Sequence, residues 1–91
     1  MNSDIIDELV DFIEDKIINK IYDNENILIV YGRNIRINYN NNLYKISNET
    51  IKNNIKYIKS KLGSNIKVIL NEETVELHNS IKTYWILTIT W

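Results

Sequence analysis

The stretch Thr83–Trp91 constrains the fold more than any other part of this chain. It holds nine β-branched, aromatic or aliphatic residues without glycine or proline, which predicts a β-strand. Because alternate side chains of a strand point to opposite sides, the odd-numbered residues from Trp85 to Trp91 form one wholly apolar face. Such a strand would promote aggregation at an exposed edge. We therefore expect it inside a sheet, with helices covering its apolar face.

The composition is that of a globular protein. The 91 residues are 44% hydrophobic and 25% charged, which suits a single domain over residues 1–91 with its own core. Cysteine is absent, which excludes disulfides, thiolate nucleophiles and cysteine-ligated zinc. Near the N-terminus, carboxylates interrupt the apolar residues every few positions, which argues against a signal peptide or a membrane span. We expect a cytoplasmic protein.

Two segments have the apolar period of an amphipathic helix. Residues 3–22 place their apolar side chains along one stripe and their carboxylates on the other side. Residues 49–62 carry a second apolar stripe, preceded by Ser47 or Asn48 as an N-cap and ended by Gly63.

The segment between the two helices predicts three strands. Ile27–Tyr31 and Ile35–Tyr39 are expected to pair as a hairpin around Gly32-Arg33-Asn34, because glycine and asparagine accept positive φ angles. Residues 43–46 predict a short third strand.

The C-terminal part predicts three more strands. Ile66–Leu70 and Thr74–Leu77 are expected to form a hairpin that turns at Asn71-Glu72-Glu73, and the strand around Trp85 follows. The sequence thus predicts an α+β fold in the order α-β-β-β-α-β-β-β, with a mostly antiparallel sheet and both helices packed on one face.

The first predicted helix carries a dense line of carboxylates on the side facing away from the core. Carboxylates on one helix face do not converge, so we expect no metal site. A solvated helix face is the simplest interpretation, but such a line can also imitate the phosphates of nucleic acid and occupy a basic groove on another protein. The partner-binding residues predicted on this basis are Asp4, Asp7, Asp11, Glu14 and Asp15, with Glu8 beside them.

The basic residues gather elsewhere and suggest an alternative. Lysines recur along one flank of the second helix, and tyrosines nearby could stack on bases. The net charge of −1, however, falls short of the basic footprint of a nucleic-acid-binding domain. The residues predicted for this alternative are Arg33, Arg36, Lys52, Lys56 and Lys59.

The two charged flanks are expected to lie apart. Three strands between the helices reverse the chain direction each time, so the helices should run parallel. On parallel helices that share a sheet face, the acidic flank of the first and the lysine flank of the second cannot face each other. At least one flank then stays open for a partner.

Catalytic motifs are missing from the sequence. His78 has Glu76 two positions before it, which would suit a general base, but no nucleophile or phosphate-binding loop accompanies them. A hydrolase around these two residues is therefore the third and weakest hypothesis. We expect no enzyme and no cofactor, because so small a core leaves little room for a pocket.

Residue usage points to the origin of the gene. Isoleucine and asparagine are the most frequent residues, while alanine, proline and glutamine are absent, which indicates AT-rich codons. The leading hypothesis is a small stand-alone module, encoded by a phage or other mobile element, that binds and inhibits a host defence protein in the manner of an anti-CRISPR. Its partner would be a host protein. Nucleic acid is the alternative partner, and a homodimer is compatible with the sequence.

Overall fold

The computed structural model describes residues 2–91 and confirms the α+β class. Two helices and five antiparallel strands follow the order α-β-β-β-α-β-β. Helix α1 spans Asn2–Tyr22, and helix α2 spans Asn48–Leu62. The strands are β1 (Ile27–Tyr31), β2 (Ile37–Tyr39), β3 (Asn42–Tyr44), β4 (Lys67–Leu77) and β5 (Ser80–Thr90), and a short 3-10 helix, η1 (Gly32–Asn34), joins β1 to β2.

Strand β5 is the central strand of the main sheet, as its composition predicted. The sheet has the order β1-β5-β4, and both of its strand pairs are antiparallel. β5 pairs with β1 from Ile86 to Thr90 and with β4 along its whole length. The apolar strand is therefore protected on both edges where it crosses the core.

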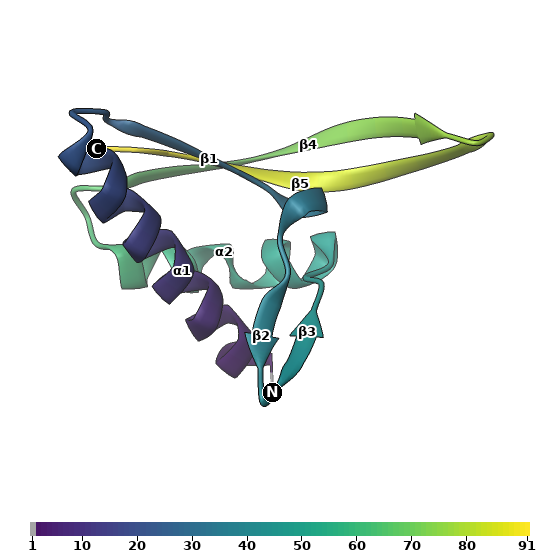
Figure 1. Ribbon diagram of the computed structural model, residues 1–91, viewed down its shortest axis with the longest axis horizontal. Helices are drawn as coiled ribbons and strands as arrows, with labels where there is room; N and C mark the ends of the chain where they lie inside the picture. The colour runs from purple at the N-terminus through teal and green to yellow at the C-terminus, as the bar shows by residue number, and fades with distance from the viewer. Residues whose placement is uncertain (1) are drawn as a thin grey trace.

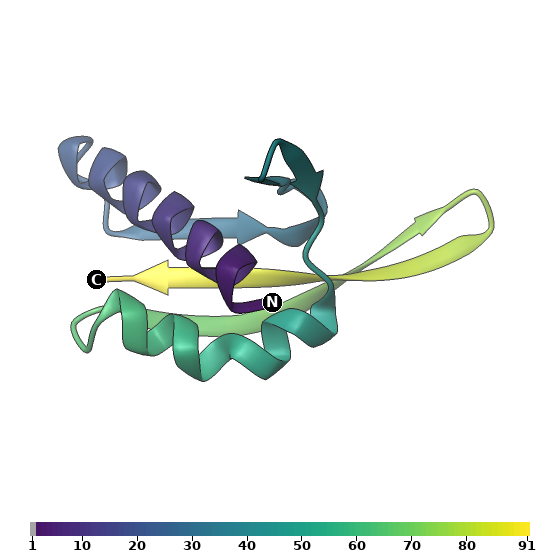
Figure 2. The same cartoon turned by 90° about the horizontal axis from the view of Figure 1, so that it is seen from below.

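Both helices lie on the same face of this sheet, also as expected (Figure 2). They run in the same general direction, toward the end of the sheet where the C-terminus lies (Figure 2). The opposite face is open to solvent, where Ile27, Ile29, Tyr31 and Ile69 remain 38–43% exposed.

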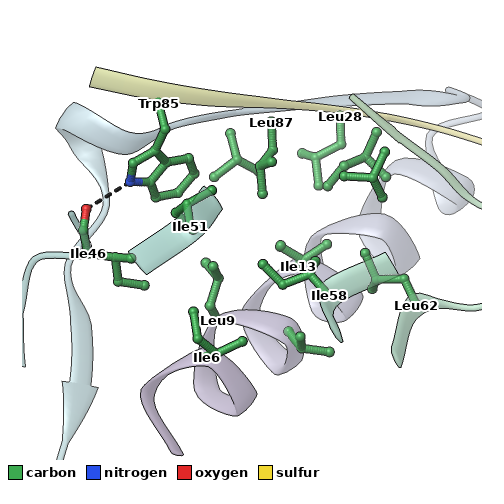
Figure 3. Close-up of a cluster of buried hydrophobic side chains, with 14 of the residues drawn as sticks. Ile6, Leu9, Ile13, Leu28, Ile46, Ile51, Ile58, Leu62, Trp85 and Leu87 are labelled. Atoms are coloured by element: carbon green, nitrogen blue, oxygen red, sulfur yellow. Dashed lines mark hydrogen bonds between the residues drawn. The ribbon is translucent and has the colours of Figure 1, made fainter. Parts of the chain in front are cut away.

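The core lies between the helices and the covered face of β5 (Figure 3). Trp85, Leu87 and Ile89 are at most 2% exposed and pack against the apolar stripes of α1 and α2. The Trp85 indole Nε1–H donates to the carbonyl oxygen of Ile46 at 2.8 Å (Figure 3). This hydrogen bond fixes the segment between β3 and α2 to the central strand.

The predicted hairpin between Ile27–Tyr31 and Ile35–Tyr39 is wrong. β1 pairs with β5, while β2 pairs with β3 in a separate two-stranded sheet. The reason lies at Gly32, where a Cβ atom would stand 2.6 Å from Cε2 of Trp85. The backbone packs so closely on the indole that the chain turns through η1 and leaves the sheet. The second sheet consequently stands beside α1 (Figure 1).

The predicted hairpin at Asn71-Glu72-Glu73 is also wrong, which reduces six expected strands to five. These residues belong to the continuous strand β4, and the chain turns at His78 and Asn79, whose φ angles are 48° and 65°. Positive φ at both central residues is what a two-residue type I′ hairpin requires. The β4–β5 hairpin extends beyond the helices (Figure 1). Because solvent reaches this part of the hairpin, polar residues are compatible with a strand there.

Candidate functional site

The carboxylates of α1 lie outside the core because the apolar stripe of the helix faces the sheet. Ile6, Leu9 and Ile13 are fully buried, and this rotation of the helix directs the acidic side toward solvent. Glu8, Asp11, Glu14 and Asp15 are exposed, and none of them belongs to an ion pair within the described residues.

Asp4 and Asp7 differ from the other acidic residues because tyrosines bind them. The Tyr39 hydroxyl on β2 donates to Asp4 Oδ2 at 3.0 Å. The Tyr57 hydroxyl on α2 donates to Asp7 Oδ1, and this hydrogen bond joins the two helices. These two predicted partner-binding residues therefore help to hold the fold together.

The hydroxyl groups of Tyr39 and Tyr57 should lose their protons at a higher pH than an ordinary tyrosine, and are called late groups here. The hydrogen bonds to Asp4 and Asp7 raise the pKa of Tyr39 and of Tyr57 above the ordinary value of 10.0. A pKa that is higher in the folded state stabilises the protein fully below the unfolded pKa, and this stability is lost as pH rises through the folded pKa. We expect Tyr57→Phe to remove one late group from a titration of phenolate absorbance. Tyr22→Phe is the control, because it removes the hydroxyl of an 83% exposed tyrosine and leaves the hydrogen bonds to Asp4 and Asp7 intact. A late phase that is unchanged in both Tyr57→Phe and Tyr39→Phe would contradict this assignment.

A cleft of about 320 Å³ separates α1 from the start of β2. The second wall exists because η1 turns the chain out of the main sheet and brings β2 alongside α1 (Figure 1). Ile37 is only 4% exposed and anchors β2 in the core. The cleft, called here the acidic cleft, is lined by Glu8, Asp11, Phe12 and Asp15 of α1 and by Arg36, Ile37 and Asn38.

Arg36 is the one guanidinium in the lining of the acidic cleft, and backbone carbonyls hold it. Its Nη1 donates to the carbonyl oxygens of Arg33 at 3.3 Å and Ile35 at 3.1 Å. No ion pair joins it to Glu8, Asp11 or Asp15 in the described part of the chain. Three carboxylates facing one guanidinium leave the cleft with an excess of negative charge.

The structure divides the residues predicted for nucleic-acid binding. Arg33 pairs with Glu73 at 3.2 Å, and Lys52 pairs with Glu72 at 2.9 Å. Both glutamates belong to β4, so Lys52 of α2 lies beside the edge of the sheet opposite to β1. Lys56 and Lys59 are exposed on α2, and Arg36 lines the acidic cleft. Nucleic-acid binding by this set stays a prediction.

The two polar residues weighed for catalysis lie far from this cleft in the fold. His78 occupies the exposed turn at the tip of the β4–β5 hairpin, and Glu76 pairs with Ile81 on the adjoining strands. Within residues 2–91, no three histidine or acidic side chains are grouped to hold a metal ion. No helix in the same range is both long and apolar enough to cross a membrane.

The structure unites residues that the sequence assigned to different functions. Asp11 and Asp15 come from the predicted partner-binding set, and Arg36 from the nucleic-acid set, yet all three line one cleft. In the sequence, Ile5 and Phe12 lie off the core stripe of their helix, which indicated either a broad buried face or a neighbouring element on that flank. Nothing in the sequence placed Ile37 and Asn38 beside this helix, because local patterns do not show which distant strand packs against it. No known protein family, curated protein or solved structure matches this chain.

Proposed function

We propose that this chain binds a host protein through the acidic cleft and inhibits it, as an anti-defence protein of a phage or other mobile element. One observation carries the proposal: Asp11 and Asp15 line a preformed cleft without an ion-pair partner among the described residues. Carboxylates in this state favour a cation supplied by another molecule.

The lining of the acidic cleft suits a lysine or arginine side chain of the partner. The half-buried Phe12 offers apolar surface to the aliphatic stem of such a side chain, and Asp11 and Asp15 offer oxygen acceptors to its charged head. Arg36 restricts where a second cation can approach. A partner with a basic groove would also be steered toward this face over long distances.

Defence proteins that act on nucleic acid fit this description. Their basic grooves bind phosphates, and exposed carboxylates at helical spacing can compete for the same lysines and arginines. The AT-rich residue usage supports an origin in a phage or mobile element of a low-GC host. This chemistry and the residue usage are the support for a defence target and for inhibition of the anti-CRISPR type.

A phage-plating assay tests the inhibitor directly. The chain is expressed in strains that each carry one defence system, and each strain is challenged with a phage that the system blocks. We expect plating to recover in one strain with the wild-type chain and to be lost with Asp11→Lys/Asp15→Lys. Both positions are exposed, so each substitution should change the free energy of unfolding by no more than about 0.5 kcal/mol.

Lys56→Glu/Lys59→Glu is the matched control, because it also reverses two exposed charges on a helix. It should restore plating as the wild type does. A chain that restores plating in no strain would overturn the proposed inhibition. Plating that survives the aspartate reversal but not the lysine reversal would instead assign function to the lysine flank.

A further inference from the structure

The two free edges of the main sheet differ in charge. Strand β4 carries Lys67, Glu72, Glu73 and Glu76, and charged residues are a common protection against strand pairing. Strand β1 reads Ile-Leu-Ile-Val-Tyr and has no charge and no proline, and among the strands of residues 2–91 it pairs only with β5. The edge of β1 is therefore unprotected and suited to pairing with another strand.

The hydrogen-bond pattern shows which backbone groups of β1 are free. The Trp91 N–H donates to the carbonyl oxygen of Asn26 at 3.3 Å, one step beyond the Ile27–Thr90 pair. Because alternate residues of an antiparallel strand bond to the same neighbour, Leu28 and Val30 bond to β5. The N–H and C=O groups of Ile27 and Ile29 consequently point to the free edge.

A small apolar pocket lies beside this edge. It measures about 160 Å³ and opens between α1 and β1, where the later half of α1 extends past the strand (Figure 2). Phe12 lines both this pocket and the acidic cleft, so the two are neighbours. The pocket is lined by Phe12, Lys16, Asn34, Ile35 and the β1 residues 28–31.

We propose that a segment of the partner pairs with β1 as an added strand and places a lysine or arginine in the acidic cleft. The inference rests on the proposed function and specifies the form of the partner segment. Its backbone bonds to Ile27 and Ile29, one aliphatic side chain enters the apolar pocket, and the basic residue lies beyond the Tyr31 end of β1.

A second copy of the chain fits this site poorly. Antiparallel pairing of β1 with the β1 of another copy, centred on Ile29, places Asp23 of that copy opposite Ile35 and Glu25 opposite Arg33, whose guanidinium already pairs with Glu73. The acidic cleft lies at the same end, so like charges would meet. Charge complementarity thus favours a basic, extended peptide over self-association.

Selection from random peptides displayed on phage tests the inference without knowledge of the host protein. The baits are the wild type, Ile29→Pro, Thr74→Pro and Asp11→Asn/Asp15→Asn. Proline at Ile29 removes an N–H that faces the free edge and no bond to β5, so the sheet should survive. Thr74→Pro is the matched control, because its N–H faces outward from β4 by the same alternation.

We expect the wild type and Thr74→Pro to enrich peptides that combine a lysine or arginine with aliphatic residues at alternate positions. Synthetic copies should bind about tenfold more weakly to Ile29→Pro and to Asp11→Asn/Asp15→Asn. Methylation of alternate backbone nitrogens of the peptide should weaken binding to the wild type about as much. Because the methylated peptides leave the protein unchanged, this measurement tests the added strand even if Ile29→Pro fails to fold.

Several results would overturn the inference. Peptides that depend on Asp11 and Asp15 but tolerate Ile29→Pro and methylation would refute the added strand and leave the proposed function standing. Peptide binding that is as tight to Asp11→Asn/Asp15→Asn as to the wild type would refute both the added strand and the proposed function. Enrichment of no peptide, or a dimer of the wild type that Ile29→Pro dissociates, would refute the peptide as the occupant of this edge.

Discussion

Replacing Trp85 with alanine should destabilise the protein by about 3–5 kcal/mol, the usual cost of removing a fully buried indole. Trp85 is 2% exposed and lies at one end of the buried cluster, beside Ile46 and Ile51 (Figure 3). The substitution also leaves the carbonyl oxygen of Ile46 without its hydrogen-bond donor. Both losses fall on the central strand, where the helices, η1 and the segment before α2 meet.

Denaturant unfolding followed by circular dichroism measures this effect. Trp91→Ala is the control, because Trp91 has the same side chain near the end of β5 but is only partly buried. It should cost clearly less than Trp85→Ala. A loss below about 1 kcal/mol for Trp85→Ala would place the indole outside the core and contradict the fold described above.

Gly32→Ala should destabilise the protein by about 1–3 kcal/mol. An added Cβ would stand 2.6–2.7 Å from Cε2, Cδ2 and Nε1 of Trp85. These atoms belong to a rigid ring that the hydrogen bond to Ile46 holds in place, so the ring cannot move aside without cost. The unfolding free energy of the variant measures this cost.

A double-mutant cycle separates crowding from other causes. Trp85→Phe shortens the ring, so Gly32→Ala should cost less in that background than in the wild type, by about 1 kcal/mol. Equal costs in both backgrounds would show that Gly32 is needed for another reason. Crowding against the Trp85 indole would then not be the reason why glycine is required at this position.

Much of the fold followed from local patterns in the sequence. The apolar alternation around Trp85 placed β5 inside the sheet, and the two apolar stripes placed both helices on one face. The second helix is capped as its flanks indicated: Ser47 Oγ accepts from the Thr50 N–H at 3.2 Å, and Gly63 has a φ of 98°. Helix caps and apolar stripes could be predicted because they depend on residues that lie close together in the sequence.

The wrong predictions concern features of the fold that depend on residues far apart in the sequence. Gly32 was predicted to lie in a turn because glycine accepts positive φ angles. In the structure, the backbone at Gly32 lies so close to the Trp85 indole that a side chain does not fit there. Asn71-Glu72-Glu73 looked like a turn because the hairpin that carries it projects into solvent, where a strand can be polar. The acidic cleft needed β2 as its second wall, and no local pattern placed that strand beside α1.

The acidic cleft is tested most directly by pull-down from a host lysate, quantified by mass spectrometry, with three baits: the wild type, Asp11→Lys/Asp15→Lys and Lys56→Glu/Lys59→Glu. We expect one host protein to be retained by the wild type and by the lysine variant, and its recovery to fall about tenfold or more with the aspartate variant. Equal recovery of that protein with the aspartate variant would show that the cleft is not the binding site.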